Sequence, residues 1–471
     1  MPKRNLRAIF LASTGALCAS FLAQPGTASA QQANNRAELE ARLAQLEAAV
    51  AELRGELETA RAAQAAATSQ AAAASATAAK ASEQVAAIEK RPAAPASDGF
   101  TIGGTTFKAS GFIKTVANFT RYDDGDVPTG AFIKDFYLPQ QIPVGGTREG
   151  NDFTAHAKQT RLQFSTSTPI GKHVLKGVAE FDFQTAPGAQ ATQRTTNGYN
   201  LALRRGFFTY DHFLAGQEWS NFQYVAALPE STDFVGATEG TVFVRQEQFR
   251  YTFALNKQAA LSVAIENPET SSITPTSAAL VENDDDHLPD VTARINYVAN
   301  IGELSLAGVV RQLSVDNGTV RSRATGWGIS AAGKLPFGPD KRHDFRFNAT
   351  YGDGIGRYVG LNFAPDVVFV GTPGSALETV KDFAAFAAVK IGWAKALRTS
   401  FIGSYQRVYY PGAVAIPTSA NRTAWSVAGN IFWSPVKSFD VGVEFRHGER
   451  EIANGQKGQL DRIEFATRYS F

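Results

Sequence analysis

Beyond about residue 100, the sequence is a succession of short segments in which apolar and polar side chains alternate, as in strands with two different faces. In 173–184, the odd positions are mostly apolar, whereas the even positions include Lys176, Glu180 and Asp182. The segment 423–433 alternates in the same way. About sixteen such segments follow one another, each near the 9–11 residues that a tilted strand needs to cross a bilayer. The pattern predicts an all-β transmembrane barrel of about 16 antiparallel strands at residues 100–471.

The connectors between these segments are alternately short and long. Residues 169–172 and 434–438 form tight turns, whereas the long connectors are 121–154, 268–289, 352–379 and 410–422. Outer-membrane barrels have short periplasmic turns and long external loops, so this asymmetry favours a barrel. A soluble β-sandwich is the alternative, but it does not explain the aromatic residues at the strand ends together with an export signal.

The first thirty residues have the layout of a secretory signal. Cations within residues 1–7 precede an apolar run over 9–22, and small residues at 28–30 form a signal peptidase site. We therefore predict a signal peptide at 1–30. A transmembrane anchor is the alternative, but the run is shorter than the roughly 20 residues that span a bilayer. Cleavage removes the single cysteine, Cys18, and changes the formal charge from +2 to −1, which argues against disulfides and against a nucleic-acid partner.

The last segment also has a period of two and ends on an aromatic residue. Apolar residues occupy one parity and charged residues the other, with Ile463, Phe465, Tyr469 and Phe471 against Arg462, Glu464 and Arg468. This pattern describes a strand that faces lipid on one side and water on the other. Together with the export signal, it predicts localisation in the bacterial outer membrane, in contact with lipid and lipopolysaccharide.

Residues 31–91 are rich in Ala, Glu, Gln and Arg and carry a heptad pattern. Apolar residues recur at spacings of 4 and 3, at Leu39, Leu43, Leu46, Val50, Leu53 and Leu57. In a parallel assembly, Arg42 would meet Glu47 and Glu56 would meet Arg61. We predict a periplasmic coiled coil at 31–91 and a linker at 92–99, because Pro92 ends a helix. A lone helix or disorder over 62–84 is the alternative.

The strand parity opposite the apolar one must line the interior of the barrel, and arginines are frequent on it. The candidate solute path consists of Arg161, Arg204, Arg205, Arg245, Arg250, Arg294, Arg311, Arg346, Arg446 and Arg462, of which Arg204 and Arg205 are adjacent and so have uncertain parity. Acids on this parity are fewer, namely Glu180, Asp182, Glu266, Glu444 and Glu464. A guanidinium binds carboxylate at two points, so the excess favours passage of anions. The alternative is that the arginines pair with these acids.

The connector 222–243 is rich in turn formers and acids. It could fold inward and narrow the pore, with Glu230 and Asp233 facing basic wall residues. It could equally be an external loop that contacts a neighbouring subunit, and the sequence leaves both readings open for 223–243.

No pattern of catalytic residues supports an enzyme. The six histidines are scattered without metal-ligand spacing, and no serine lies in a nucleophile elbow. The run Asp284-Asp285-Asp286 could hold calcium but lacks the glycine and distal glutamate of an EF-hand, so a solvated loop is the simpler reading. We therefore expect no catalytic residues, no metal site and no cofactor.

The motif-rich stretch 204–253 resembles the DcaP-like trimeric outer-membrane porins. The resemblance rests on Arg205-Gly206-Phe207-Phe208, Gly216-Gln217-Glu218-Trp219-Ser220-Asn221-Phe222, Leu228-Pro229-Glu230, Asp233-Phe234, Arg245-Gln246 and Arg250-Tyr251. It implies a homotrimer of sixteen-stranded barrels that passes small anionic solutes, typically dicarboxylates. The long Ala-rich coiled coil at 31–91, called here the stalk, departs from that pattern. The solute and the pore size stay open.

These observations give three functional hypotheses. The first is passive diffusion of small carboxylates along the arginines of the barrel interior. The second is a structural tether, in which the stalk contacts peptidoglycan. The third, a phosphate or sugar pore, ranks last because a sugar pore needs aromatic residues along its lumen, and here they fall mainly on the lipid parity.

Overall fold

The computed structural model describes residues 99–185 and 195–471, together with isolated helical positions between 43 and 61. The chain divides into two compact units, 1–96 and 97–471. The predicted signal peptide, the heptad pairs of the coiled coil and most of the linker lie outside the described residues, so those predictions stay predictions. Among the described residues, no helix is long and apolar enough to cross a membrane.

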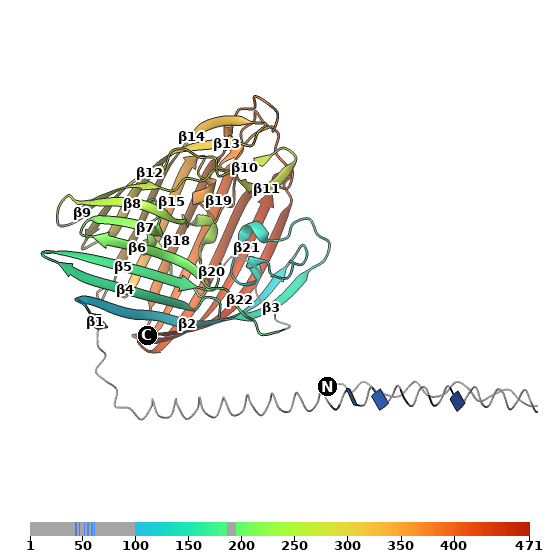
Figure 1. The fold of residues 1–471 in the computed structure, drawn as a ribbon, viewed down its shortest axis with the longest axis horizontal. Coiled ribbons are helices and arrows are strands. Elements are labelled where there is room, and N and C mark those ends of the chain that lie inside the picture. Colours follow the sequence, from blue (N-terminus) through green and yellow to red (C-terminus); the bar gives the residue numbers. More distant parts are fainter. Residues whose placement is uncertain are drawn as a thin grey trace, which may run out of the picture. The chain divides into compact units, whose positions relative to one another are not determined.

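The second unit is a closed antiparallel barrel (Figure 1). Its strands, in order around the wall, are β2 (Thr105–Tyr122), β3 (Gly150–His156) with β4 (Arg161–Ile170), β5 (His173–Asp182), β6 (Ala202–Tyr210), β7 (Phe213–Trp219), β8 (Arg245–Ala254), β9 (Ala259–Glu266), β12 (Asp290–Ala299), β13 (Gly302–Asp316), β14 (Arg321–Phe337), β15 (His343–Asp353), β18 (Lys381–Gly392), β19 (Leu397–Tyr409), β20 (Asn421–Val436), β21 (Phe439–Ile452) and β22 (Lys457–Ser470). Because β3 and β4 both pair with β2, they share one position, and the wall has 16 strands. The prediction of about 16 antiparallel strands is confirmed.

The ring closes where the first long strand meets the last. β2 pairs with β22 from Phe112 opposite Ser470 to Tyr122 opposite Leu460. The short β1 (Phe100–Ile102) folds back on the start of β2. Closure leaves no open edge along the wall, so every backbone amide within it can find a partner away from water.

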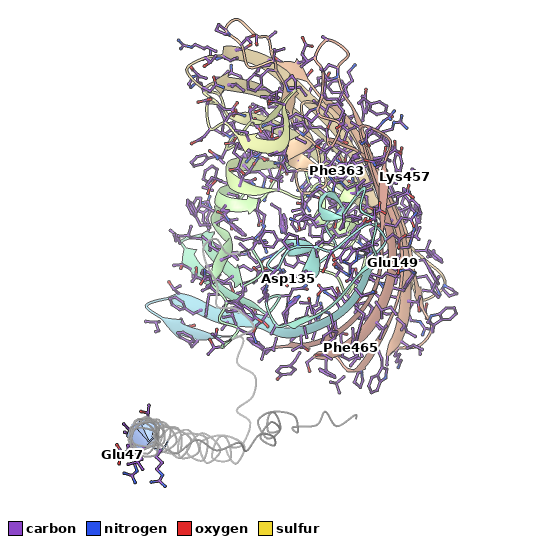
Figure 2. All side chains as sticks on the ribbon, turned by 90° about the vertical axis from the view of Figure 1, so that its right-hand side faces the viewer. Glu47, Asp135, Glu149, Phe363, Lys457 and Phe465 are labelled. Carbon is purple, nitrogen blue, oxygen red and sulfur yellow. The ribbon has the colours of Figure 1, made fainter. Side chains whose placement is uncertain are left out.

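The alternation seen in the sequence separates the two faces of the wall. On β20, Val427 and Ile431 are exposed on the outer face, whereas Ser426 and Asn430 are buried on the inner face. Figure 2 shows the same division, with Phe465 on the outside of the wall and Asp135 in the interior. The outer apolar band is the surface that a bilayer would cover.

Strand connectors at one end of the barrel are short and those at the other end are long. The β4–β5 turn consists of Gly171 and Lys172, and Gly171 has a φ of +61°, a conformation that glycine adopts without strain. The long connectors carry a four-stranded sheet of β11 (Ser277–Glu282), β10 (Ser271–Thr274), β16 (Val367–Val368) and β17 (Glu378–Thr379). They also carry five 3₁₀ turns, η1 (Phe132–Lys134), η2 (Pro139–Gln141), η3 (Val225–Ala227), η4 (Thr238–Gly240) and η5 (Gly356–Tyr358).

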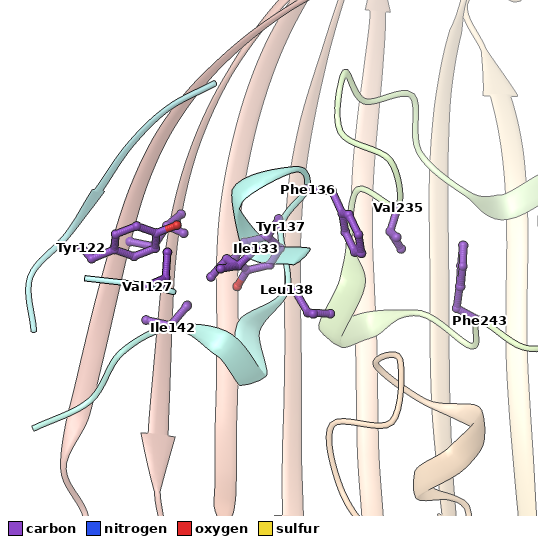
Figure 3. Packing of buried hydrophobic residues seen from close by; sticks show 10 residues of the cluster. Tyr122, Val127, Ile133, Phe136, Tyr137, Leu138, Ile142, Val235 and Phe243 are labelled. Atoms are coloured by element: carbon purple, nitrogen blue, oxygen red, sulfur yellow. The ribbon is translucent and has the colours of Figure 1, made fainter. Parts of the chain in front are cut away.

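The largest buried apolar cluster lies inside the barrel and not between layers of secondary structure. Figure 3 shows Ile133, Phe136 and Tyr137 from the β2–β3 connector near Val235 and Phe243 from the β7–β8 connector. Two connectors therefore fold into the interior and pack on each other, which partly fills the space that the wall encloses.

Candidate functional site: the barrel interior

Residues 220–244, called here the crossing segment, leave the wall after β7 and traverse the interior before β8 begins. Arg398 of β19 donates two hydrogen bonds to the Glu230 carboxylate, at 2.6 and 2.7 Å. Ser231 donates to Glu444 of β21 at 2.7 Å. These partners lie on the opposite wall, so the structure places the 222–243 connector inside the barrel and not outside it.

The two acids predicted on this segment make different contacts. Glu230 contacts a wall arginine directly and is only partly buried. Asp233 is 7% exposed and accepts the backbone N–H groups of Tyr137, Val235 and Gly236 at 2.7, 3.0 and 3.0 Å. Asp233 therefore fixes the shape of the crossing segment and joins it to the β2–β3 connector.

The part of the β2–β3 connector at 131–142, called here the inner loop, is a second inward element that the sequence did not reveal. Arg450 donates to the Ile142 carbonyl at 2.8 Å, and Arg462 donates to the Ile133 carbonyl. Tyr137 donates to Glu239 of the crossing segment at 3.4 Å, and burial raises the pKa of that carboxyl above its ordinary value. The inner loop thus uses Arg462, a predicted path residue, as an anchor.

Several predicted path arginines are bonded directly to carboxylates. Arg205 donates to Glu218 at 2.6 Å, Arg346 to Asp344 at 2.7 Å, and Arg446 to Glu444 at 2.7 Å. Arg204 donates to Glu180 at 3.0 Å and also to Asp182. A bulge in the pairing of β5 with β6 lets the adjacent Arg204 and Arg205 both bind Glu180, which resolves their uncertain parity. For this set, the pairing alternative holds.

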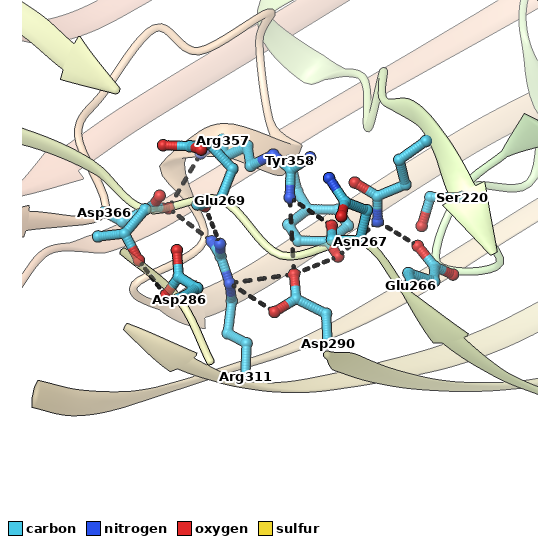
Figure 4. Close-up of polar contacts among 12 residues, drawn as sticks. Ser220, Glu266, Asn267, Glu269, Asp286, Asp290, Arg311, Arg357, Tyr358 and Asp366 are labelled. Atoms are coloured by element: carbon cyan, nitrogen blue, oxygen red, sulfur yellow. Dashed lines mark hydrogen bonds and ion pairs between the residues drawn. The ribbon is translucent and has the colours of Figure 1, made fainter. Parts of the chain in front are cut away.

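Arg311 is one of the fully buried members of the predicted set. It is 2% exposed, donates to Asp366 at 2.9 Å, and lies 3.3 Å from an oxygen of Asp290 (Figure 4). Asp290 also accepts the hydroxyl of Tyr358 at 2.7 Å. This cluster ties the four-stranded sheet and the turn η5 to the wall, so Arg311 has a structural role in the connectors.

A different set of arginines has no hydrogen-bonded carboxylate among the residues that the structure describes. The nearest carboxylate oxygens to Arg161 are at 3.8 and 4.0 Å, beyond hydrogen-bonding distance, and its Nε has no partner. Arg294 donates to the Gln223 carbonyl only. The guanidinium of Arg245 lies 5.0 Å from the Trp219 ring centroid, and Arg250 lies near Arg294. These four arginines belong to the wall between β4 and β12.

Comparison with known proteins places the chain in a family. The family model described as DcaP outer membrane protein matches residues 147–471. The chain belongs to the DcaP outer membrane protein family. The crystal structure of the outer membrane channel DcaP of Acinetobacter baumannii is similar to this DcaP-family barrel, with a TM-score of 0.64, 24% identity, and coverage of 79% of this chain and 99% of that chain. OmpT of Vibrio cholerae is more distant, with a TM-score of 0.48, 10% identity, and coverage of 80% and 100%. A search of curated proteins gave no match.

In this DcaP-family chain, two important cations were not among the predicted site residues. Arg398 holds the crossing segment through Glu230, and Lys114 of β2 donates to the carbonyl of Thr232 at 2.5 Å. Both lie on the inward parity of their strands, so parity alone could have found them.

The acidic run 284–286 does not form a common site. Asp285 accepts the backbone N–H of Asp316 at 2.6 Å, whereas Asp286 accepts the hydroxyl of Thr270 at 2.8 Å. Burial raises the pKa of Asp286 to about 6. Within the described ranges, no group of three or more His, Cys, Asp or Glu residues could hold a metal ion. The run therefore anchors the β9–β12 connector to its neighbours.

Proposed function

We propose that this protein is an outer-membrane channel for passive diffusion of small anionic solutes, with dicarboxylates as the preferred class. The observation that carries the proposal is the set of four inner-wall arginines without a hydrogen-bonded carboxylate, Arg161, Arg245, Arg250 and Arg294. A guanidinium in a narrow interior needs hydrogen-bond acceptors, and a passing carboxylate supplies them.

Charge along this part of the wall supports the same proposal. From β4 to β12, the inward arginines outnumber the inward acids. The arginines are Arg161, Arg204, Arg205, Arg245, Arg250 and Arg294, and the acids are Glu180, Asp182, Glu218, Glu266 and Asp290. After each acid is paired with one arginine, a net positive charge remains on this part of the wall. The path next to it therefore attracts anions.

Dicarboxylates are the proposed class because two free guanidiniums lie near each other. Arg250 on β8 and Arg294 on β12 flank β9 on the inward face, because Arg250 stands opposite Ala264 and Arg294 opposite Ser262. Like charges in such an arrangement repel unless an anion lies between them. A solute with two carboxylates can bind both at once, whereas chloride cannot bridge them in the same way.

Two further parts of the proposal concern assembly. We propose a homotrimer whose coiled coil at 31–91 lies in the periplasm, on the basis of the heptad spacing and the family resemblance. The similar crystal structure is that of an outer membrane channel, which agrees with a transport role.

The test replaces the facing pair of arginines by alanine. The variant Arg250→Ala/Arg294→Ala should lose anion-over-cation selectivity, measured as the reversal potential in planar bilayers under a low-salt gradient. The effect should shrink at 1 M salt, where the Debye length is about 3 Å. Succinate passage should fall more than chloride passage.

The matched control is Arg321→Ala/Arg342→Ala. It also removes two positive charges, but from exposed positions at the start of β14 and in the β14–β15 turn. Arg321 and Arg342 pair with Asp316 and Asp340, and their side chains are 80% and 46% exposed. If both double variants keep the reversal potential of the parent protein, the anion channel proposal is wrong.

A further inference from the structure

A cavity of about 190 Å³ lies inside the barrel, next to the middle of the crossing segment. Its wall is formed by β2, β4, β20, β21 and β22, and its cover by residues 231–234 of the crossing segment. It is separate from the Arg250 and Arg294 pair, neither of which lines it. The cavity thus offers a second place along the interior where a solute could stop.

Three cations lie side by side across the strands that form this wall. Phe112 and Lys114 are two residues apart on β2 and so share the inward face. Arg161 on β4 stands opposite Phe112, and Arg468 on β22 stands opposite Lys114. Like charges on neighbouring strands destabilise a sheet unless a counter-charge is present.

Carboxylates lie near these cations, with Asp233 and Asp440 in the lining and Glu464 acting on the charge of Lys114, but Arg161 has no hydrogen-bonded acid. Arg468 is neutralised by Asp440, whose Oδ2 accepts two hydrogen bonds from its guanidinium at 2.5 and 3.1 Å. The Oδ1 of Asp440 accepts a hydrogen bond from Arg398 at 3.1 Å. Lys114 instead donates to two neutral oxygens, those of Gln159 at 2.6 Å and Thr232 at 2.5 Å. Arg161 has no carboxylate within hydrogen-bonding distance in the described part of the chain, and its buried Nε has no partner. The cavity therefore contains donors that an anion would satisfy.

Aromatic side chains share the rest of the lining with polar residues, namely Gln159, Ser231, Thr232 and Thr467. The aromatic residues are Phe112, Phe234 and Phe432, and they come from β2, the crossing segment and β20. Phe112 lies 5.2 Å from the Arg161 guanidinium carbon and 5.8 Å from that of Arg468, measured to the ring centroid. The free guanidinium of Arg161 is thus adjacent to the Phe112 ring. A ligand with a charged end and an apolar body can contact both.

We propose that this cavity is a binding site for a small monocarboxylate that carries an apolar ring, with the carboxylate on Arg161 and the ring against Phe112 and Phe432. The volume is below the roughly 300–1,000 Å³ of sites for drug-sized molecules, so it suits an acid with a single ring. The inference rests on the proposed anion channel, because the acid reaches the cavity through the same interior.

The test compares two probes of equal charge, benzoate and acetate, as blockers of the chloride current through single channels of the purified full-length protein. Benzoate should stay in the channel longer than acetate, by about three- to tenfold, because ring contacts add to the shared carboxylate contact. Phe112→Leu and Phe432→Leu should each shorten benzoate events and leave acetate events unchanged. Arg161→Gln should shorten both.

The control is Phe119→Leu, which lies on the same strand but on the outer face, where its side chain is 62% exposed. It should leave both probes unchanged and so exclude a general loss of barrel integrity. Equal residence of benzoate and acetate in the parent protein, or benzoate events that survive both Phe→Leu changes, would overturn the site. Either result would contradict the cavity site alone, because the parent protein would still select anions. A parent protein that does not select anions would instead contradict the proposed channel function.

Discussion

At the scale of single residues, Arg311 is an inward arginine that stabilises the fold and does not line the solute path. Its guanidinium is enclosed by Asp290 and Asp366, so removing it leaves Asp366 without this ion pair and Asp290 with only the more distant Arg357, at 3.8 Å. We expect Arg311→Ala to lower the free energy of unfolding by about 3–5 kcal/mol, the usual cost of breaking a buried ion pair. Urea unfolding of the protein in detergent measures this directly.

The control for Arg311 is the triple variant Arg311→Met/Asp290→Asn/Asp366→Asn, which removes the cation and both charges together. It should recover much of the lost stability, because neutral side chains carry a far smaller burial cost than unpaired carboxylates. A single Arg311→Ala variant as stable as the parent protein would show that the cluster contributes nothing to the fold.

Residue parity in the sequence could identify which arginines face inward, but not which of them are free. Arg204 and Arg161 both lie near Glu180, yet Arg204 approaches it to 3.0 Å and Arg161 only to 3.8 Å. The difference depends on a bulge between β5 and β6 that brings Arg204 and Arg205 to the same acid. A period of two carries no information about such a bulge, so pairing could only be left as an alternative.

At the scale of elements, the strands were predictable and the inward connectors were not. A strand with one face in lipid and one in a polar interior must alternate apolar and polar side chains. This pattern can be recognised from consecutive residues alone. The inner loop at 131–142 has no such period, because its burial depends on distant partners. Arg450 and Arg462, which hold it, are more than 300 positions further along the chain.

The crossing segment is held by a contact that can be removed without touching its own backbone hydrogen bonds. Glu230→Gln should weaken its two charge-assisted hydrogen bonds to Arg398, at 2.6 and 2.7 Å, and free the segment to move. We expect larger and noisier single-channel currents. Asp340→Asn, which disrupts an ion pair with Arg342 in the β14–β15 turn, should change neither. Unaltered currents in Glu230→Gln would mean that this contact does not set the position of the segment.

At the scale of the whole molecule, the barrel and the predicted stalk differ in whether they need other copies to cover exposed edges or apolar faces. The barrel closes on itself through β2 and β22, so its wall has no open edge that a second copy would have to pair with. A heptad helix at 31–91 would expose an apolar stripe along its length, and only association with other copies would bury that stripe. The stalk is thus the part of the sequence that most directly predicts assembly.

That assembly can be tested by a cysteine at a core position of the predicted coiled coil. The predicted signal cleavage would remove Cys18, so Leu46→Cys would then introduce the only thiol of the mature protein. In a parallel coiled coil, the same position of each helix faces its copies across the core, so mild oxidation of membranes should give a covalent product between subunits. Ala51→Cys, which lies on the outer side of the same heptads, should cross-link far less. A Leu46→Cys protein that stays monomeric under these conditions, in membranes where the barrel is assembled, would show that the stalk does not associate in parallel.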